Sequence, residues 1–467
     1  MSGMLRTISP VDGRVYVERP LATGDEIDAA LLAVRESQRY WRRTKIADRA
    51  AICTRMVDAF VAKRDEIASE ISWQMGRPIC QAAAEVAGFE ERARHMIAIA
   101  AESLEDIDPG TKPGFSRFVR REPLGVVLTV APWNYPYLTA VNSIVPAILA
   151  GNALILRHSA QTPLCAERIA QAFATADAPP GLFGVLHTSH ADTERLIGSP
   201  GIDFVAFTGS VGAGRSIQRA AADRFIGVGL ELGGKDPAYV RPDAALDHAV
   251  ENLVDGAFFN SGQSCCGIER IYVHESVYDR FVDAFVDAVQ QYRLGDPTDP
   301  ETNLGPVINA KAADRVRGQV SDAIAAGARG LVDASAFACS AEDGPYLAPQ
   351  VLVDVDHSMR VMTEESFGPV VGIARVGSDD EAVERMNDSD FGLTASVWTR
   401  NQQAALALGD RVETGTWFMN RCDYLDPALA WTGVKDSGRG CTLSSVGFEA
   451  LTRPKSFHLR AALPDDD

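Results

Sequence analysis

The chain has 467 residues and a formal net charge of -18, from 63 acidic and 45 basic side chains. This length exceeds one ordinary core, so we expect two or three domains. A hydrophobic content of 46% and a charged content of 23% are typical of a globular protein and argue against disorder. The negative excess repels phosphate backbones and anionic lipid, so neither nucleic acid nor a membrane is expected as a partner.

The N-terminal residues and the cysteines indicate a reducing compartment. Residues 1–6 lack the apolar core of a signal peptide. The eight cysteines contain no C-x-x-C pair and the eight histidines are scattered, so no metal site is predicted. Dispersed cysteines without a secretory signal are typical of reduced thiols, and we expect a cytoplasmic protein. The most apolar stretch, 137–156, contains Asn142 and Pro146 and is a poor membrane span.

The first half of the chain predicts helices followed by a parallel sheet. Residues up to about 105 are expected to be helical, because 47–63 carry apolar side chains at helical spacing. Residues 116–130 predict a hairpin that leads into a buried strand. Strand-like and helical segments then alternate from 152 to 224, which is typical of a parallel sheet with crossover helices.

A second alternation follows. Residues 246–259 predict a helix, 270–273 a strand and 278–292 an amphipathic helix, with further strands near 351–355, 370–376, 394–399 and 415–420. Residues 456–459 alternate in polarity and could add a strand to another sheet. No Pro/Gly/Ser-rich linker separates the halves, so we expect tightly packed domains with a cleft between them.

Cys265 is the candidate nucleophile. It lies in the glycine-containing segment 258–266, directly before Cys266. A free cysteine is usually a small core residue, and Cys266 fits that interpretation. A thiolate, however, is a strong nucleophile that also leaves well from a thioester, so Cys265 suits covalent catalysis.

Glu231 and Asn134 are the candidate partners of this thiol. Glu231 has apolar neighbours and precedes Gly233 and Gly234, a setting that raises the pKa of a carboxyl and suits a general base. The alternative for Glu231 is a solvated acid at a strand end. Asn134 could be a turn residue, but its amide group can also hold an oxyanion without titrating.

The segments around Asn134, Glu231 and Cys265 resemble the aldehyde dehydrogenase superfamily, and the resemblance extends from residue 8 to residue 455. It implies an α/β fold with a Rossmann-like dinucleotide-binding domain (1–106 and 125–232) and an α/β catalytic domain (233–432). It also implies a small β element (107–124 and 433–467) that bridges subunits of a homodimer or homotetramer. Asn134 and the backbone N–H of Cys265 are then expected to form an oxyanion hole.

The resemblance also implies NAD or NADP as the cofactor. Glu365 would hold the nicotinamide ribose. Ala160 stands where the family often has a glutamate, and Arg157 keeps a cation nearby, so we expect NADP to be accepted beside NAD. We place His158 on the solvated surface. The expected cofactor-binding residues are Trp133, Arg157, Ser159, Ala160, Gly209, Ser210, Gly214, Glu365 and Phe367.

The substrate is expected to be a small-molecule aldehyde. By resemblance, the entry channel is lined by Tyr135, Leu138, Arg421, Leu425 and Trp431. Most of these side chains suit a neutral aldehyde, whereas Arg421 could bind the carboxylate of a semialdehyde such as succinate semialdehyde. Members that act on short dicarboxylic semialdehydes often have Arg near position 142, where this chain has Asn142.

Three other functions are compatible with parts of the pattern. An acyl transfer to coenzyme A is disfavoured by Glu231, because members of that type commonly lack the general base. A catalytically idle binding or structural homologue is disfavoured by the intact set of Asn134, Glu231 and Cys265. A cofactor-free thiol hydrolase would need a positioned histidine, and only His158 lies in these motifs.

Overall fold

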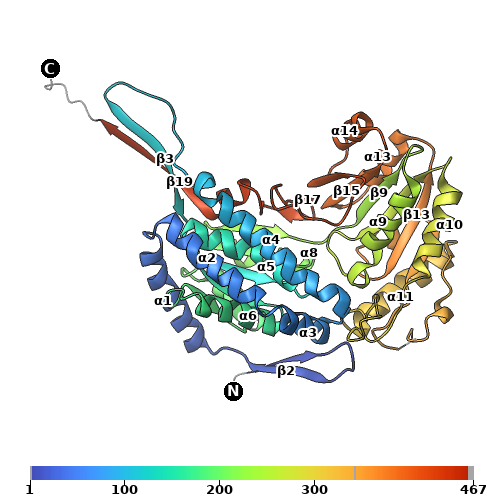
Figure 1. The fold of residues 1–467 in the computed structure, drawn as a ribbon, viewed down its shortest axis with the longest axis horizontal. Coiled ribbons are helices and arrows are strands. Elements are labelled where there is room, and N and C mark those ends of the chain that lie inside the picture. Colours follow the sequence, from blue (N-terminus) through green and yellow to red (C-terminus); the bar gives the residue numbers. More distant parts are fainter. Residues whose placement is uncertain (1–2, 341–342, 461–467) are drawn as a thin grey trace.

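The computed structural model describes residues 3–340 and 343–460. Two α/β bodies lie side by side, and a two-stranded arm projects from the first body (Figure 1). The predicted α/β fold is therefore confirmed. Among the described residues, no helix is both long and apolar enough to cross a membrane, and no cluster of three or more potential metal ligands occurs.

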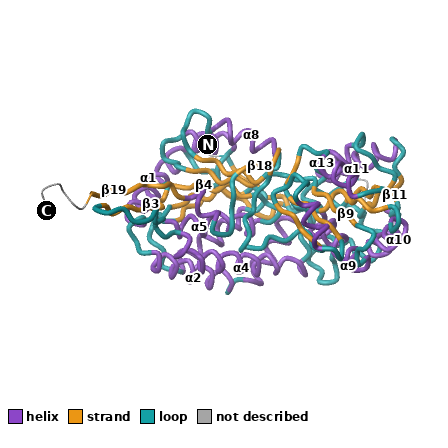
Figure 2. Tube along the Cα trace, turned by 90° about the horizontal axis from the view of Figure 1, so that it is seen from above, coloured by secondary structure: helices purple, strands orange, loops and turns teal. Residues whose placement is uncertain are grey.

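The first body is built on a six-stranded sheet in the order β18-β8-β7-β4-β5-β6. The strands pair in parallel except β18, which is antiparallel to β8. Helices cover both faces, with α2, α4 and α5 on one side and α8 on the other (Figure 2). The strands are β4 (Val126–Ala131), β5 (Ala153–His158), β6 (Phe183–Val185), β7 (Phe204–Thr208), β8 (Gly227–Glu231) and β18 (Gly438–Arg439).

Eight helices surround this sheet. The longest, α4, packs against α5, whose residues are almost all buried, as expected for the apolar stretch from 137. The helix α1 begins with a capping box between Thr23 and Glu26. The helices are α1 (Gly24–Trp41), α2 (Ile46–Val61), α3 (Arg64–Met75), α4 (Ile79–Ser103), α5 (Pro136–Ala150), α6 (Pro163–Thr175), α7 (His190–Gly198) and α8 (Val211–Ala220).

The N-terminal segment differs from the sequence prediction. Helices were expected up to about residue 105, but β1 (Met4–Ile8) and β2 (Val15–Pro20) form an antiparallel hairpin before α1. In β1, only Leu5 and Thr7 are buried. This alternation is a strand period. The prediction missed it because the exposed positions include the apolar Met4 and Ile8, so the sequence shows no alternation of polarity.

The second body has a seven-stranded sheet in the order β11-β12-β13-β10-β9-β15-β16, in which only β11 is antiparallel. Its strands are β9 (Asp236–Val240), β10 (Ile268–His274), β11 (Arg329–Gly330), β12 (Gln350–Val353), β13 (Val370–Val376), β15 (Thr394–Trp398) and β16 (Thr416–Met419). Its helices are α9 (Leu246–Phe258), α10 (Tyr278–Val289), α11 (Ala310–Ala325), α12 (Arg360–Thr363), α13 (Asp379–Asn387) and α14 (Gln402–Gly409). A small sheet pairs β14 (Phe391–Gly392) with β17 (Val434–Lys435).

The arm pairs distant segments. β3 (Phe115–Pro123) runs antiparallel to β19 (Thr452–Arg460) along its full length, and the rings of Phe118 and Phe457 stack 4.5 Å apart. The predicted hairpin within 116–130 is wrong, because β3 pairs with the C-terminal strand and β4 enters the first sheet. The pairing inside the described segment 107–124 is limited to isolated bridges, such as the one between Ile107 and Val119.

The segment between β17 and β19 belongs largely to the first body. β18 joins its sheet, and the 3-10 helix η3 (Val446–Leu451) packs on α5. Leu443, Phe448 and Leu451 are buried in the same core. The sequence-based boundary at residue 433 therefore needs correction, and only β19 of this segment forms the arm.

Candidate functional site

A strained turn presents Cys265 between the two bodies. After α9, the residues Asn260, Ser261 and Gly262 adopt successive φ values of 53°, 57° and 70°. A side chain at Gly262 would meet the carbonyl of Gly368 at 2.3 Å, so this position requires glycine. Left-handed conformations at two non-glycine residues cost free energy and persist only where the surrounding structure holds them. The turn places the partly buried Cys265 at a fixed position.

Asn134 lies beside this turn. It follows β4 and precedes α5, and its side-chain Nδ2 donates to the carbonyl of Gln263 at 3.2 Å. The backbone N–H of Cys265 has no acceptor among the described residues. Both donors are therefore close to the thiol, as an oxyanion hole requires.

A buried ion pair holds both segments together. The Arg77 guanidinium donates to Glu85, to the carbonyl of Asn134 and to the side chain of Asn260. The other oxygen of Glu85 accepts the backbone N–H groups at the start of α5. Arg77 and Glu85 are both 1% exposed, so this network is withdrawn from water. It fixes the Asn134 loop against the Cys265 turn.

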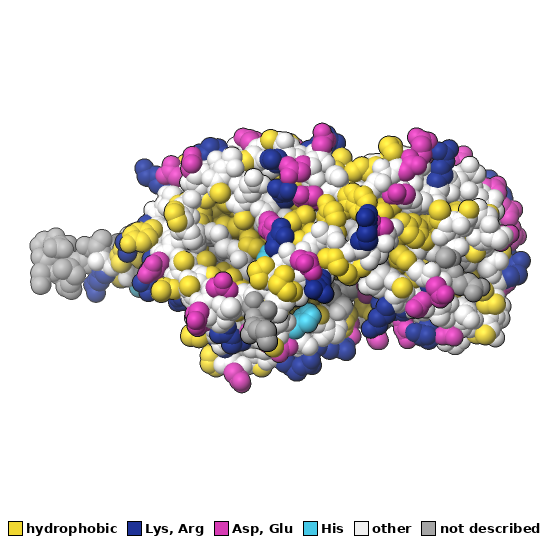
Figure 3. All heavy atoms as spheres, turned by 90° about the horizontal axis from the view of Figure 1, so that it is seen from below, with side chains coloured by type: hydrophobic (Ala, Val, Ile, Leu, Met, Phe, Trp, Pro, Cys, Tyr) yellow, Lys and Arg dark blue, Asp and Glu magenta, His cyan; other side chains and the backbone are white. Residues whose placement is uncertain are grey.

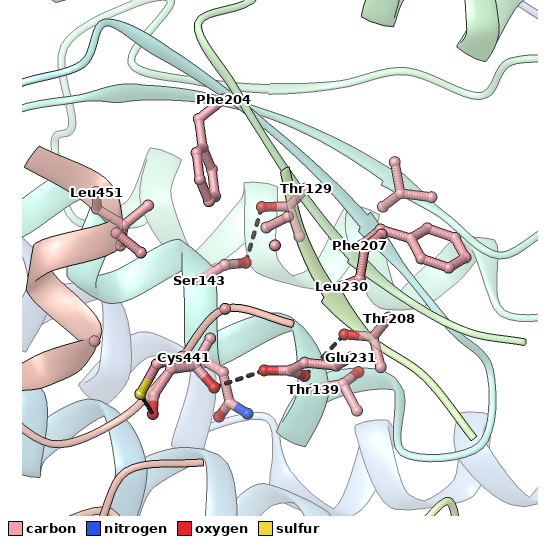
Figure 4. Close-up of a pocket in the computed structure, with 18 of the residues that line it drawn as sticks. Thr129, Thr139, Ser143, Phe204, Phe207, Thr208, Leu230, Glu231, Cys441 and Leu451 are labelled. Atoms are coloured by element: carbon pink, nitrogen blue, oxygen red, sulfur yellow. Dashed lines mark hydrogen bonds between the residues drawn. The ribbon is translucent and has the colours of Figure 1, made fainter. Parts of the chain in front are cut away.

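Glu231 ends β8 and is held by two hydroxyl groups. Thr208 donates to Oε2 at 3.0 Å and Thr442 to Oε1 at 2.6 Å (Figure 4). Burial raises the pKa of this carboxyl, against the lowering effect of the two hydrogen bonds. A small cavity of about 40 Å³ lies behind Glu231, lined partly by Thr129 and Ser143, whose hydroxyl groups are 2.9 Å apart (Figure 4). An acid with a raised pKa suits proton exchange with water.

The two glycines after Glu231 allow a close approach of backbones. A side chain at Gly234 would lie 2.4 Å from the carbonyl oxygen of Cys265, and one at Gly233 would lie 2.2 Å from the carboxylate of Glu365. Both contacts exclude a Cβ atom. The glycines thus bring Glu365 and the Cys265 turn onto the end of β8.

Glu365 is positioned by a second buried ion pair. Lys235 donates to Glu269 and to the hydroxyl of Ser366. The Glu269 carboxylate accepts the backbone N–H groups of Ser366 and Phe367, which fixes the turn. Glu365 itself accepts from the N–H of Gly234 at 3.1 Å. Burial, with Glu269 nearby, raises the pKa of Glu365 to about 7.

A cavity of about 340 Å³ extends from Cys265 along this turn. The N-terminus of α8, capped by Ser210, opens on it and suits a phosphate group. The cavity, together with the close approach of Glu365 that Gly233 allows, fits the nicotinamide end of the expected cofactor. Five of the predicted cofactor residues line this cavity: Trp133, Gly209, Ser210, Glu365 and Phe367. The catalytic candidate Glu231 lines it as well.

The other predicted cofactor residues lie elsewhere. Arg157, Ser159 and Ala160 lie at or just beyond the carboxyl end of β5, the edge where β4 also ends. This edge is where doubly wound sheets bind dinucleotides, so their role for the adenosine end stays a prediction. Gly214 lies inside α8, where a Cβ would meet Leu232 at 2.7 Å, and we reassign it to helix packing.

The prediction that His158 lies on the solvated surface is wrong. Its side chain is 2% exposed, with Nε2 3.0 Å from the carbonyl of Pro136 and Nδ1 3.1 Å from the hydroxyl of Thr162. Burial lowers the pKa of His158 to about 4, so the ring is neutral at pH 7. It connects β5 to the start of α5 and is not available to a phosphate.

A second cavity, of about 440 Å³, reaches Cys265 from the opposite side. Of the predicted substrate residues, Tyr135, Leu138, Leu425 and Trp431 line it. Arg421 does not, because its exposed guanidinium stacks on the ring of Tyr424, 3.5 Å from the ring centre. The expectation that Arg421 binds a substrate carboxylate is therefore corrected.

The sequence prediction missed charged residues in this cavity. Arg92 on α4 and Asp423 in the loop after β16 both line it. Asp423 accepts from the thiol of Cys266 at 2.9 Å and from the hydroxyl of Ser264 at 3.2 Å, so it holds both neighbours of the nucleophile. Burial raises the pKa of Asp423 to about 7. Neither residue stands in a recognisable motif, and no local pattern in the sequence indicates that either one lines a cavity.

Comparisons with known proteins show the family of this chain. The sequence model described as "Aldehyde dehydrogenase family" matches residues 2–457. A succinate-semialdehyde dehydrogenase [NADP(+)] 1 of Mycobacterium bovis is 35% identical over 460 residues, which cover 97% of this chain and 99% of that protein. The solved NADP-dependent glyceraldehyde-3-phosphate dehydrogenase of Bacillus halodurans, complexed with NADP, has a TM-score of 0.92 at 32% identity and covers 98% of this chain and 96% of that one. The succinic semialdehyde dehydrogenase of Streptococcus pyogenes, solved with NADP+ as the cofactor, has a TM-score of 0.92 at 28% identity. The match covers 98% of this chain and 100% of that one.

Proposed function

Since the chain belongs to the aldehyde dehydrogenase family and is an NAD(P)-dependent enzyme, we propose that Cys265 is its nucleophile and Glu231 its general base in the oxidation of an aldehyde to a carboxylic acid. One observation carries this assignment. Cys265 and Glu231 line both the cavity that fits the nicotinamide and the cavity on the opposite side. Substrate and cofactor can therefore meet at the same two side chains.

The first step is addition of the Cys265 thiolate to the aldehyde carbon. The carbonyl oxygen becomes an oxyanion, which accepts hydrogen bonds from Asn134 Nδ2 and the backbone N–H of Cys265. Asn134 must release the carbonyl of Gln263, to which it now donates. Donors of this kind act through preorganised electrostatics, and losing one typically lowers turnover by about 10²–10³-fold.

Bound NAD or NADP supplies the acceptor for the hydride that leaves the aldehyde carbon. Trp133, Ser210, Glu365 and Phe367 would hold the cofactor at its nicotinamide and phosphate parts. The edge-on contact of the Trp133 and Phe367 rings, with centres 5.6 Å apart, closes one wall of that cavity. Loss of the hydride leaves an acyl thioester on Cys265.

Hydrolysis of the thioester completes the reaction. Glu231 takes a proton from a water molecule, whose oxygen adds to the acyl carbon. The thiolate of Cys265 then leaves, and the carboxylic acid is released. The raised pKa of Glu231 makes its carboxylate a better proton acceptor than an exposed glutamate.

We also propose that the enzyme is a homodimer or homotetramer. The arm of β3 and β19 projects from the first body and presents unpaired strand edges (Figure 1). Pairing of these edges with a second copy would protect them. The relatives named as succinate-semialdehyde dehydrogenases support a small aldehyde as the substrate class.

A matched pair of cysteine variants tests the assignment of the nucleophile. With NADP and a panel of aldehydes, Cys265→Ala should have no measurable turnover, because no acyl-enzyme can form. Cys266→Ala should keep most of it, because the Cys266 thiol is buried and donates its hydrogen to Asp423. Equal losses in the two variants would show that the nucleophile is misassigned.

A further inference from the structure

Arg92 is a buried cation in the substrate cavity. It forms no direct ion pair among the described residues, although the carboxylates of Glu85 and Glu231 lie near enough to raise its pKa against the lowering effect of burial. Its side chain comes from α4, is 8% exposed and lines the cavity with Cys265 and Glu231. Its Nη1 donates to the carbonyl of Leu138 at 2.7 Å and to Oδ1 of Asn142 at 3.2 Å. Within residues 3–340 and 343–460, Nε and Nη2 have no acceptor and no carboxylate forms an ion pair with Arg92.

The neighbouring acids are already engaged. Glu85 is shared between Arg77 and the first N–H groups of α5. Glu231 accepts from Thr208 and Thr442. A guanidinium stays charged in a protein, and burying it with only neutral acceptors costs free energy that an anionic ligand would offset.

We propose that Arg92 is a specificity-determining residue that binds a carboxylate at the far end of the substrate, so that the enzyme prefers short aldehydes carrying an ω-carboxylate. This inference rests on the proposed role of Cys265. The guanidinium keeps two unused donor groups, and a carboxylate can accept from both at once. The same cavity holds the aldehyde end at Cys265 and the anionic end at Arg92.

The acids of the cavity do not provide an equivalent site for a cation. One carboxylate oxygen of Asp423 accepts hydrogen bonds from both Cys266 and Ser264. Burial raises the pKa of Asp423 to about 7, which reduces its charge at neutral pH. Asp255 lies at the exposed rim, where partial loss of hydration and the nearby Glu251 raise its pKa. Glu91 is exposed and accepts from the hydroxyl of Tyr424. Arg77, the other cation of this cavity, is paired with Glu85, whereas the hydrogen-bond acceptors of Arg92 are neutral, so Arg92 keeps donors for an anionic substrate.

The test compares three aldehydes of equal chain length with saturating NADP: succinate semialdehyde, butanal and the corresponding ω-ammonium aldehyde. The variants are Arg92→Gln and Arg92→Lys, with Arg94→Gln as the control. Arg94 is two residues further along α4, but its partners are the surface acids Asp58 and Glu90. We expect the ratio of kcat/KM for succinate semialdehyde over butanal to fall about 10- to 100-fold in Arg92→Gln. Arg92→Lys should recover part of the ratio, and Arg94→Gln should keep all of it.

A second measurement needs no turnover. The product succinate should raise the Tm of the parent protein and of Arg94→Gln, but not that of Arg92→Gln, while NADP should raise the Tm of all three. An unchanged ratio in Arg92→Gln, or a parent protein that prefers butanal or the ammonium aldehyde, would overturn the assignment of Arg92 and leave the proposed function standing. Failure of the parent protein to oxidise any of the three would overturn both.

Discussion

At the scale of single residues, adjacent thiols have different environments. Cys265 is partly buried and lines both cavities, whereas Cys266 is 3% exposed and donates to Asp423. The neighbouring Cys265 thiol and burial raise the pKa of Cys266 well above its usual value, so Cys266 stays protonated. A protonated thiol is a poor nucleophile. The local environments therefore support the proposal that Cys265, and not Cys266, is the nucleophile.

Residue 160 bears on the choice between NAD and NADP. A carboxylate near the adenosine ribose accepts hydrogen bonds from its hydroxyl groups and repels a 2′-phosphate. The methyl group of Ala160 does neither, and Arg157 supplies a cation that is only weakly engaged, with Nη2 3.4 Å from the carbonyl of Thr188. We expect Ala160→Glu to shift the ratio of kcat/KM toward NAD by about ten-fold, since one charge contact is worth about 1–2 kcal/mol.

Steady-state kinetics with both cofactors in both proteins measures this shift. Ala160→Gln is the matched control, because it adds a side chain of similar size at the same position without adding charge. A parent protein with no turnover on NADP, or an unchanged ratio in Ala160→Glu, would contradict this reading of the segment after β5.

At the scale of elements, the first turns of α4 stabilise the position of the site. Glu85 pairs with Arg77 and also accepts the first N–H groups of α5. Removing one member of a buried pair leaves an uncompensated charge, which typically costs about 3–5 kcal/mol. Glu85→Ala should therefore lower the free energy of unfolding by that amount, measured by urea denaturation.

Glu90→Ala on the same helix is the matched control. Glu90 pairs with the partly exposed Arg94, and surface pairs contribute about 0–1 kcal/mol. Equal losses of stability in Glu85→Ala and Glu90→Ala would show that the buried pair does not brace the site.

The elements also show how far the sequence alone predicts the structure. The apolar period of 246–259 predicted α9 to within one residue at its end, because one face of that helix packs on its body's core. The partner of β3 could not be predicted, since β19 is distant in sequence and no local pattern sets such a pairing. Cys265, Glu231 and Asn134 stand in local motifs, whereas Arg92 and Asp423 reach the cavity only through tertiary packing.

At the scale of the whole molecule, the site lies where the two bodies meet. Glu231 comes from the first sheet, and Cys265 from the turn that leads into the second. The surface viewed from below carries acidic and basic side chains of both signs, with hydrophobic side chains in the waist between the bodies (Figure 3). The proposed reaction therefore depends on how the two bodies are placed against each other.

The arm provides a prediction about assembly. Deleting residues 452–467 removes β19 and leaves β3 without its partner. If the arm joins subunits, the shortened protein should have the mass of a monomer or a smaller oligomer than the parent protein, measured by light scattering at micromolar concentration. Deleting only 461–467 leaves β19 intact and should change nothing. A parent protein at the monomer mass of 50.2 kDa would contradict the proposed oligomer.

The most direct test of the account is a pre-steady-state measurement on Glu231→Gln. Glutamine keeps the size of the side chain and can still bond Thr208 and Thr442, but it cannot take a proton from water. Cys265 should still form the thioester, so mixing the variant with aldehyde and NADP should give a rapid burst of NADPH close to one per active site. Steady-state turnover should then be strongly reduced. Loss of the burst together with turnover, or turnover equal to that of the parent protein, would contradict the role of Glu231 in hydrolysis.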